Sequence, residues 1–380
     1  MAKNVTITVE TGRHERPEGL LSAAMPEGAK AEGMLVDTRA PKNALPYQVL
    51  DGMLHFAAPK MPAKKTVTFE FLPDKSNPGR LGTAEVVEKE GKLDFLMKGK
   101  LFTSYNYKPD PAPKPYFYPV IGPREIPVTR GWPMDPQKGD VEDHPHHKSI
   151  YVSHGDINGA DVWSEAEGHG GQKHEQFMRL VSGPFVSGFD EKLTWHDKDG
   201  KPLMGEVRTA RLYNLPWNMR VMDIGVKFVA EHGPVTFGDT KEGGLISVRV
   251  ATSMNGNKTG LIENAFGGMG EAECWGKPSP WVDYSGMVKG KRLGIAVFDH
   301  CNNLRHPARW HVRDYGLFAL NPFALSHYKY GRDTDGSYRL EAGKELAFSF
   351  RIVIHQNDAV RGKIKESYLT YAFPPKVGIA

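Results

Sequence analysis

The sequence predicts an all-β protein: a large antiparallel two-sheet sandwich preceded by a small N-terminal β unit. Three observations lead to this fold class. Glycine and proline are frequent, at 41 and 28 of 380 residues, and they separate many short runs in which apolar and polar residues alternate. No long stretch has the periodicity of a helix. The runs do not alternate with helical segments, which argues against a parallel sheet with crossover helices.

The expected strands follow from alternation, because successive side chains of a strand point to opposite faces of a sheet. In chain order they are residues 5–9, 66–71, 92–97, 221–228, 245–250, 292–298 and 347–354. Two segments that end in Asp-Gly, 197–200 and 333–336, are expected to be hairpin turns. Residues 358–371 are the best candidate for a short helix, with Val360, Ile364 and Leu369 as its apolar positions.

A change of composition divides the chain near its first fifth. Residues 72–79 contain two prolines and a glycine among polar residues, which predicts a linker. We therefore expect residues 1–75 to form a small N-terminal β domain and residues 81–380 to form the supersandwich domain.

Composition excludes some classes of function. Hydrophobic residues make up 39% and charged residues 25% of the chain, as in globular proteins. The net charge of +4 is small and its lysines are dispersed, so no nucleic-acid partner is expected. No run approaches the roughly 20 apolar residues of a membrane span. The opening residues lack the apolar centre of a signal peptide. We expect a periplasmic or extracellular location if a signal peptide was removed, and otherwise a cytoplasmic one. The sequence does not indicate an oligomeric state.

Histidines concentrate in one part of the chain. Six of the 15 lie between His144 and His174, and three fall within residues 142–147. Histidine ligates metals and transfers protons near neutral pH. Pro145 favours an extended His144, and in an extended segment His144 and His146 point to one side and His147 to the other. Such a pair could bind a divalent metal ion or flank a sugar ring; the alternative is a pair of imidazoles hydrogen-bonded to neighbouring backbone and to Asp143.

Two more polar segments follow. Residues 154–163 are rich in turn formers, and Trp163 is either a stacking platform for a sugar or a core residue. Lys241 and Glu242 precede the strand at 245–250, where they form either an acid/base or clamp pair or a solvated turn. Arg249 lies on the same strand face as Ser247 and could bind a carboxylate or an oxyanion.

The last two segments combine aromatic rings with charged groups. Residues 274–286 include Trp275, Trp281 and Asp283, which suits carbohydrate recognition or a tightly packed loop. In the segment 303–323, extended register places His311, Arg313 and Tyr315 on one face and Trp310, Val312 and Asp314 on the other. A row of imidazole, guanidinium and phenol offers acid/base and anion-stabilising groups.

Taken together, residues 116–120, 143–147, 154–159, 239–243 and 310–317 resemble the bacterial PmoA-like family of uncharacterised proteins. The resemblance runs from about residue 81 to the C-terminus. It implies a β-supersandwich of galactose-mutarotase type and a role in carbohydrate degradation. It also implies a site on a concave sheet face, where His and Glu or Asp side chains transfer protons on a sugar. The same scaffold hosts lyases and glycoside hydrolases, so it does not select the reaction.

The leading hypothesis is a carbohydrate-active enzyme that acts on a sugar or uronide by histidine-assisted proton transfer, as a lyase, hydrolase or epimerase. The alternatives are a metal-dependent enzyme of the same fold and a non-catalytic glycan-binding protein. The hypothesis requires the segments around His146 and His311 to meet. The predicted catalytic residues are His146, His311, Arg313, Tyr315, Lys241 and Glu242; the predicted substrate-binding residues are His144, His154, Trp163, Arg249, Trp275, Trp281, Asp283 and Asn321; the metal candidates are His146, His147 and His311.

Overall fold

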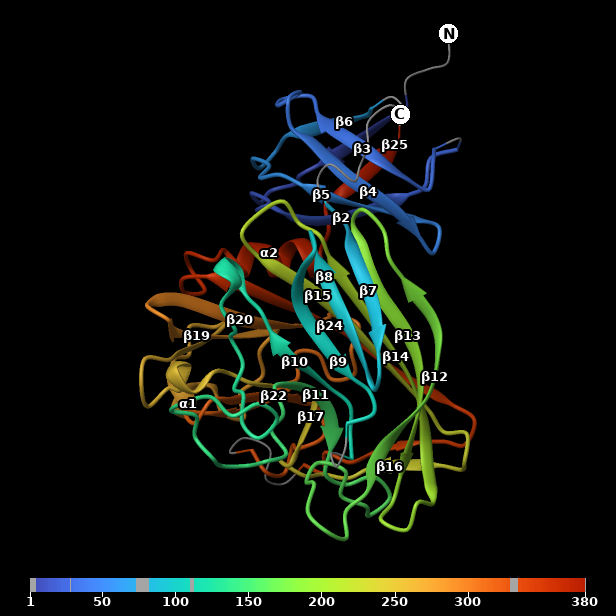
Figure 1. Ribbon diagram of the computed structural model, residues 1–380, viewed down its shortest axis with the longest axis vertical. Helices are drawn as coiled ribbons and strands as arrows, with labels where there is room; N and C mark the ends of the chain where they lie inside the picture. The colour runs from blue at the N-terminus through green and yellow to red at the C-terminus, as the bar shows by residue number, and fades with distance from the viewer. Residues whose placement is uncertain (1–4, 28, 73–81, 110–112, 329–333, 380) are drawn as a thin grey trace.

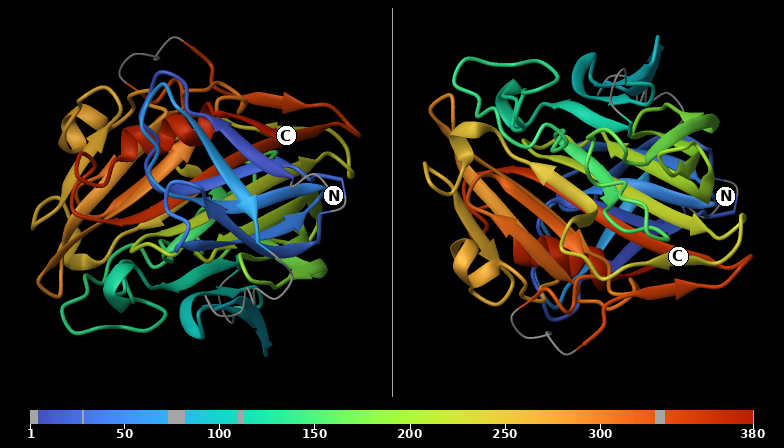
Figure 2. Two further views of the ribbon diagram at one scale, coloured as in Figure 1. Left: turned by 90° about the horizontal axis from the view of Figure 1, so that it is seen from above. Right: turned by 90° about the horizontal axis from the view of Figure 1, so that it is seen from below.

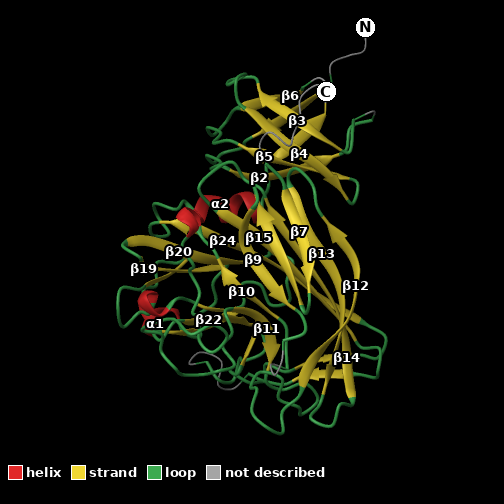
Figure 3. Cartoon of the chain, in the orientation of Figure 1, coloured by secondary structure: helices red, strands yellow, loops and turns green. Residues whose placement is uncertain are grey.

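The computed structural model describes residues 5–27, 29–72, 82–109, 113–328 and 334–379. Antiparallel strands make up most of the regular secondary structure in this part of the chain, and its two α-helices are short (Figure 1; Figure 3). These helices are α1 (Gly270–Cys274) and α2 (Ile364–Ala372). The predicted fold class, an all-β antiparallel supersandwich with a small N-terminal β unit, is confirmed.

One sheet forms the N-terminal unit and lies over one end of the rest of the molecule (Figure 1; Figure 2). Within the described residues it has seven strands in the order β2-β5-β4-β3-β6-β1-β25. Its strands are β1 (Thr6–Glu10), β2 (Gly19–Ala24), β3 (Glu32–Asp37), β4 (Ala44–Leu50), β5 (Met53–Ala58), β6 (Thr66–Phe71) and β25 (Lys376–Ile379).

The last strand of the chain belongs to this first sheet. β25 pairs with β1, and Val377 is the register partner of Val9. The prediction had assigned all of residues 81–380 to the supersandwich, and the structure differs from it at β25, because pairing with the edge strand β1 satisfies backbone groups at both chain ends. The expected linker at 72–79 lies, apart from Leu72, outside the described residues.

Two large sheets form the sandwich. In the described ranges each has eight strands: β21-β22-β17-β11-β10-β9-β8-β7, here called the first sandwich sheet, and β12-β13-β14-β15-β24-β20-β19-β18, the second sandwich sheet. The first comprises β7 (Ala84–Lys89), β8 (Lys92–Met97), β9 (Lys100–Asn106), β10 (Tyr116–Val120), β11 (Ile150–His154), β17 (Gly243–Arg249), β21 (Arg309–Arg313) and β22 (Leu317–Asn321). The second comprises β12 (Gly171–Val181), β13 (Val186–His196), β14 (Pro202–Tyr213), β15 (Arg220–Val229), β18 (Leu261–Asn264), β19 (Trp281–Val288), β20 (Lys291–Asp299) and β24 (Glu345–Gln356).

Smaller elements complete the sandwich. β16 (Val235–Phe237) pairs with β23 (Tyr338–Leu340). Where the structure describes the connections, two single turns of 3₁₀-helix lie in them, η2 (Pro123–Glu125) and η3 (Thr252–Met254). Among the described residues no helix is long and apolar enough to cross a membrane.

The main core lies between the two sandwich sheets. Alternate residues of the first sheet, such as Phe117, Val248 and Trp310, join Phe189 and Phe350 of the second in one buried cluster. Fully burying an apolar side chain of this size contributes about 1.5–3 kcal/mol, so this cluster dominates the stability of the sandwich. Successive side chains of a strand point to opposite faces of the sheet. The residues that alternate with these core residues therefore point away from the core.

A second core joins the N-terminal sheet to the sandwich. It brings together Phe69 of β6, Trp281 of β19, Phe298 of β20 and Tyr368 of α2. Trp281, which the sequence suggested as a sugar-holding residue, is only 7% exposed here. It packs between two β units because β19 begins at this residue, where the sequence had suggested a binding loop.

The local predictions can be compared with these elements. Every expected strand overlaps an observed one, and residues 197–200 turn between β13 and β14 as predicted. Residue 333 of the second expected turn lies outside the described residues, so this turn stays a prediction; the strand that follows it, β23, pairs with β16. The helix is confirmed as α2, but Val360 was wrong: it precedes α2 and is 73% exposed, because residues 358–362 close a turn on Asp358.

Candidate functional site

The predicted histidine, arginine and tyrosine side chains gather on the face of the first sandwich sheet that points away from the main core. Direct cross-strand pairs link Tyr116 to Tyr151, Tyr151 to Ser247, Ser247 to Ala319 and Ala319 to His311. Residues paired in this way share a face of the sheet. A small apolar cluster, separate from the main core, forms the floor of this face; it consists of Tyr116, Tyr151, Trp163, Leu317 and Ala319.

A buried arginine that the sequence analysis missed shapes the histidine segment. Nη1 of Arg130 donates to the carbonyl oxygens of Val141 at 3.0 Å and Asp143 at 2.8 Å, and Nη2 donates to those of His144 at 3.0 Å and His147 at 3.3 Å. The amide of His147 donates to the carbonyl of His144 at 3.0 Å, which closes a turn. Because a buried guanidinium needs acceptors for its N–H groups, it draws the backbone around itself.

This turn overturns one expectation. The segment was expected to be extended, with His144 and His146 opposite His147. His144 instead has φ +43°, and the centroid of the His147 ring lies 4.8 Å from that of His144 and 4.4 Å from that of His146. Pro145 favours an extended backbone at His144, but the hydrogen bonds to Arg130 outweigh this preference. All three imidazoles therefore lie together.

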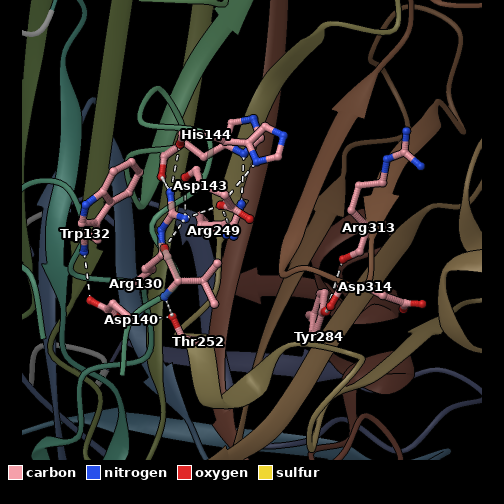
Figure 4. Close-up of polar contacts among 12 residues, drawn as sticks. Arg130, Trp132, Asp140, Asp143, His144, Arg249, Thr252, Tyr284, Arg313 and Asp314 are labelled. Carbon is pink, nitrogen blue, oxygen red and sulfur yellow. Dashed lines mark hydrogen bonds and ion pairs between the residues drawn. The ribbon is translucent and has the colours of Figure 1, made fainter. Parts of the chain in front are cut away.

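Asp143 is shared by two guanidinium groups. Its Oδ1 accepts from Nη1 of Arg130 and from Nη2 of Arg249, both at 2.6 Å (Figure 4). Burial alone would raise the pKa of Asp143, but the charges of Arg249 and Arg130 outweigh burial and lower it. Arg249 was predicted to bind substrate. Its side chain is fully buried, and its guanidinium forms an ion pair with the carboxylate of Asp143.

His147 is held neutral beneath the other rings. Nη1 of Arg249 donates to Nδ1 of His147 at 3.2 Å, so this nitrogen is the unprotonated one. Burial, followed by the nearby His146 and the charge of Arg249, places the pKa of His147 well below its ordinary value. Tyr315 stacks on the exposed neighbour His144 with ring centroids 4.7 Å apart, and burial raises the pKa of Tyr315 to about 12.

His311 has a similar arginine partner. Nε of Arg313 donates to Nε2 of His311 at 3.2 Å, and Nη1 of Arg313 pairs with Glu271 at 2.7 Å. The guanidinium of Arg313 also lies 5.8 Å from the ring of Trp275. Burial lowers the pKa of His311 to about 4, against the opposing charge of Glu242. His311 is therefore neutral near pH 7, and it orients Arg313.

His146 differs from these two imidazoles. Within the described part of the chain neither of its ring nitrogens has a hydrogen-bond partner. Its ring centroid lies 6.1 Å from that of Trp163, and the ring of His311 lies 6.5 Å from the same indole. Trp163 is 2% exposed, so it is part of the floor and not a stacking platform. Burial, followed by the charge of Lys114, lowers the pKa of His146 to about 3.

Lys241 and Glu242 form a close ion pair at the edge of this group, with side chains 40% and 43% exposed. Asn321 holds their loop: its amide nitrogen donates to the carbonyl of Thr240 at 2.8 Å. A Cβ atom at position 155 would lie 2.4 Å from the carbonyl oxygen of Glu242, so Gly155 permits this approach. Burial would raise the pKa of Glu242, but its hydrogen bond with Lys241 lowers it.

Three further charged residues lie beside His146 and were not predicted. Lys114 donates to the carbonyl of Trp163 at 2.8 Å and pairs with Glu165 at 2.9 Å, and Lys148 pairs with the other oxygen of Glu165. Burial lowers the pKa of both lysines to about 7. Lys148 directly follows His147, which was a usable signal. The sequence around Lys114 and Glu165 gives none, because burial of a charge depends on distant segments.

Some predicted residues do not join this group. His154 is fully buried, and its Nε2 is bonded to the carbonyl of Gly238 at 3.0 Å. Asp283 lies on β19 in the second sandwich sheet, where its carboxylate pairs with His355 at 2.6 Å. Together with Trp281, these residues serve the packing of the sandwich, because the segments that carry them are strands where the sequence suggested loops.

The donor groups do not fit a resident metal ion. In the described ranges no group of three or more His, Cys, Asp or Glu side chains is arranged to hold one. Of the three candidate ligands, His147 and His311 each direct one ring nitrogen at an arginine N–H, which opposes a cation at that nitrogen. We therefore assign no step to a metal.

Comparisons with known proteins add a family. No curated protein matches this chain. A protein of glycosyl hydrolase family 38 from Enterococcus faecalis is similar in structure with a TM-score of 0.42 and 8% identity; the match covers 99% of this chain and 47% of that one. An α-galactosidase from Lactobacillus brevis has a TM-score of 0.28 and 8% identity, covering 82% and 38%. The chain thus spans about half the length of the first of these, and both likenesses are too distant to indicate an activity.

A family model, described as a family of unknown function (DUF6807), matches residues 92–368. The resemblance seen in the sequence was to a family of uncharacterised proteins under the name PmoA-like, and the matching model does not carry that name. Because the match covers most of the chain, this protein belongs to the DUF6807 family.

Proposed function

We propose that this protein is a carbohydrate-active enzyme that transfers a proton on a sugar, with His146 as the proton acceptor. The observation that carries the proposal is the contrast among the three imidazoles of His146, His147 and His311. His147 and His311 each accept from an arginine, whereas among the described residues His146 keeps both ring nitrogens without a partner. A general base needs a lone pair that can reach the substrate.

Neighbouring groups have roles that suit this reaction. Glu242 is ionised and partly exposed, and its charge acts on both His146 and His311, so it is the second group that can exchange a proton. Lys241 and Arg313 supply positive charge for an oxyanion. Tyr315 and His144, stacked at the exposed edge, offer ring faces to a sugar. Elimination, hydrolysis and epimerisation of a sugar each require a proton to be moved by a positioned group.

The test is the turnover of a panel of neutral and acidic glycans by wild type and variants. His146→Ala should reduce the rate by about 10²–10⁴-fold, the usual contribution of a general base. His232→Ala is the matched control: His232 is also partly exposed, but it follows β15 and neighbours Glu231, away from this group. Full activity of folded His146→Ala would refute the proposal. Glycan binding without any product in the wild type would instead indicate a glycan-binding protein.

A further inference from the structure

Two carboxylates of the candidate site are each shared by two cations. Asp143 is bound by Arg130 and Arg249, as described above. Glu165 repeats the arrangement with lysines: Oε1 lies 2.9 Å from Nζ of Lys114, and Oε2 contacts Nζ of Lys148. The side chains of Lys114, Lys148 and Glu165 are 1%, 10% and 8% exposed. When both lysines are protonated, the group formed by Lys114, Lys148 and Glu165 carries one more positive than negative charge in a nearly dry environment.

An unbalanced charge in such a place is costly, because the desolvation of an ion amounts to several kcal/mol unless a partner compensates it. Asp161 is the other carboxylate whose charge acts on Lys114. Its Oδ1 already accepts from the amides of Trp163 at 2.7 Å and Ser164 at 3.1 Å. Among the described residues, Glu165 is thus the one carboxylate that forms ion pairs with these two lysines.

The lysine pair lies beside the proposed base. The charges of Lys114 and Lys148 both act on the imidazole of His146. Lys114 also lies 5.1 Å from the centroid of Tyr151, in the floor of the site, and its ammonium bonds to the carbonyl of Trp163. A group bound by these ammonium groups would therefore stand next to His146.

We propose that Lys114, Lys148 and Glu165 form a subsite for a negatively charged substituent of the substrate, so that the substrate is an acidic sugar. The inference rests on the proposed function and names its substrate class. A lysine ammonium binds as a point charge, so the chemistry shared by a uronate carboxylate and a sulfate ester is what the subsite recognises.

The subsite has a consequence for the base. Burial and the two lysine charges hold the pKa of His146 down to about 3. A bound anion offsets those charges, and it therefore raises the basicity of His146 when substrate is present. A neutral sugar in the same position leaves His146 a weak base, which gives selectivity for acidic sugars in the rate as well as in binding.

The experiment is calorimetric titration of the full chain near neutral pH with glucuronate, glucose 6-sulfate and glucose. The wild type should bind at least one acidic sugar about tenfold more tightly than glucose, as expected for a hydrogen bond to a charged group. Lys148→Met should remove this preference, and Lys148→Arg should retain it. The tighter of the two acidic probes identifies the anion.

The chain offers a matched control. Lys89 and Lys92 share Asp94 on β7 and β8 of the same sheet, but their side chains are 53% and 41% exposed. Lys92→Met removes the same charge from a similar trio, and the preference should survive because solvent screens that pair.

The outcomes separate the subsite from the proposed function. If the wild type does not prefer either acidic probe, or if folded Lys148→Met keeps the preference, the subsite is refuted, whereas loss of turnover in His146→Ala would still support the enzyme. If Lys148 only holds the Glu165 segment in place, Lys148→Met will lower the thermal midpoint and weaken all three sugars alike, which also refutes the subsite.

Discussion

The guanidinium of Arg249 donates a hydrogen bond of 3.2 Å to Nδ1 of His147 and thereby joins strand β17 to the histidine segment. This bond determines which nitrogen of His147 carries the proton. Because Arg249 also pairs with Asp143, one buried side chain of the sheet contacts two side chains of the segment that carries His146.

Arg249→Met should strongly destabilise the protein. The substitution leaves His147 and the carboxylate of Asp143 without one buried partner, and breaking a buried ion pair costs about 3–5 kcal/mol. Urea denaturation measures this loss, and an NMR titration should show the pKa of His147 rising towards its ordinary value. Arg339→Met is the control, since Arg339 is 57% exposed and its ion pair with Glu341 contributes at most about 1 kcal/mol. Equal stability of both variants would contradict the role given to Arg249.

Arg130→Met should loosen the histidine turn. Four backbone carbonyls lose a donor, and each buried acceptor left without a partner costs about 1–3 kcal/mol. Hydrogen exchange of residues 141–148 should accelerate, and the His144–His147 contact should weaken. Arg124→Met, at an exposed arginine that bonds the side chain of Gln356, is the control and should leave exchange in this segment unchanged. Unaltered protection in Arg130→Met would show that the turn is stable without the hydrogen bonds of Arg130.

Stability should fall in mild acid. Burial lowers the pKa of His154 from 6.5 to about 4, so folding disfavours its protonation. The contribution is complete above pH 6.5 and is lost as the pH falls towards 4; at about 1.4 kcal/mol per pKa unit it amounts to roughly 3 kcal/mol. Denaturation at several pH values measures the slope, and His154→Gln should reduce it. An unchanged slope in that variant would assign the acid sensitivity to other groups, such as His146 or His311.

Asn321→Ala should displace the Lys241–Glu242 loop while leaving the sheet intact. Asn321 is buried; its amide nitrogen donates to Thr240, and its oxygen accepts from the amide of Phe323 at 2.9 Å. Losing these bonds should cost about 1–3 kcal/mol, and turnover should fall because Glu242 moves. A crystal structure and the melting temperature test this. Activity equal to wild type, with the loop displaced, would separate Glu242 from the reaction.

Much of the fold could be predicted because strand patterns are local. Alternation in residues 309–313 placed Trp310 and Val312 on one face of a strand and His311 and Arg313 on the other. The structure confirms this, and the face with Trp310 and Val312 packs into the main core. The reason is that a period of two depends only on the backbone of the strand itself. The density of histidines likewise marked one segment that does reach the sheet face opposite to the core.

The sequence by itself thus determined the all-β class, the strands and the segments rich in reactive side chains. Only the tertiary structure decided that Arg130 bends the histidine segment, that Arg249 is occupied by Asp143, that Trp281 and Asp283 belong to the packing, and that Lys114 and Lys148 share Glu165. Each of these depends on burial and on partners that approach from other segments. Desolvation and hydrogen-bond satisfaction are properties of the assembled sheets, so no local pattern along the chain records them.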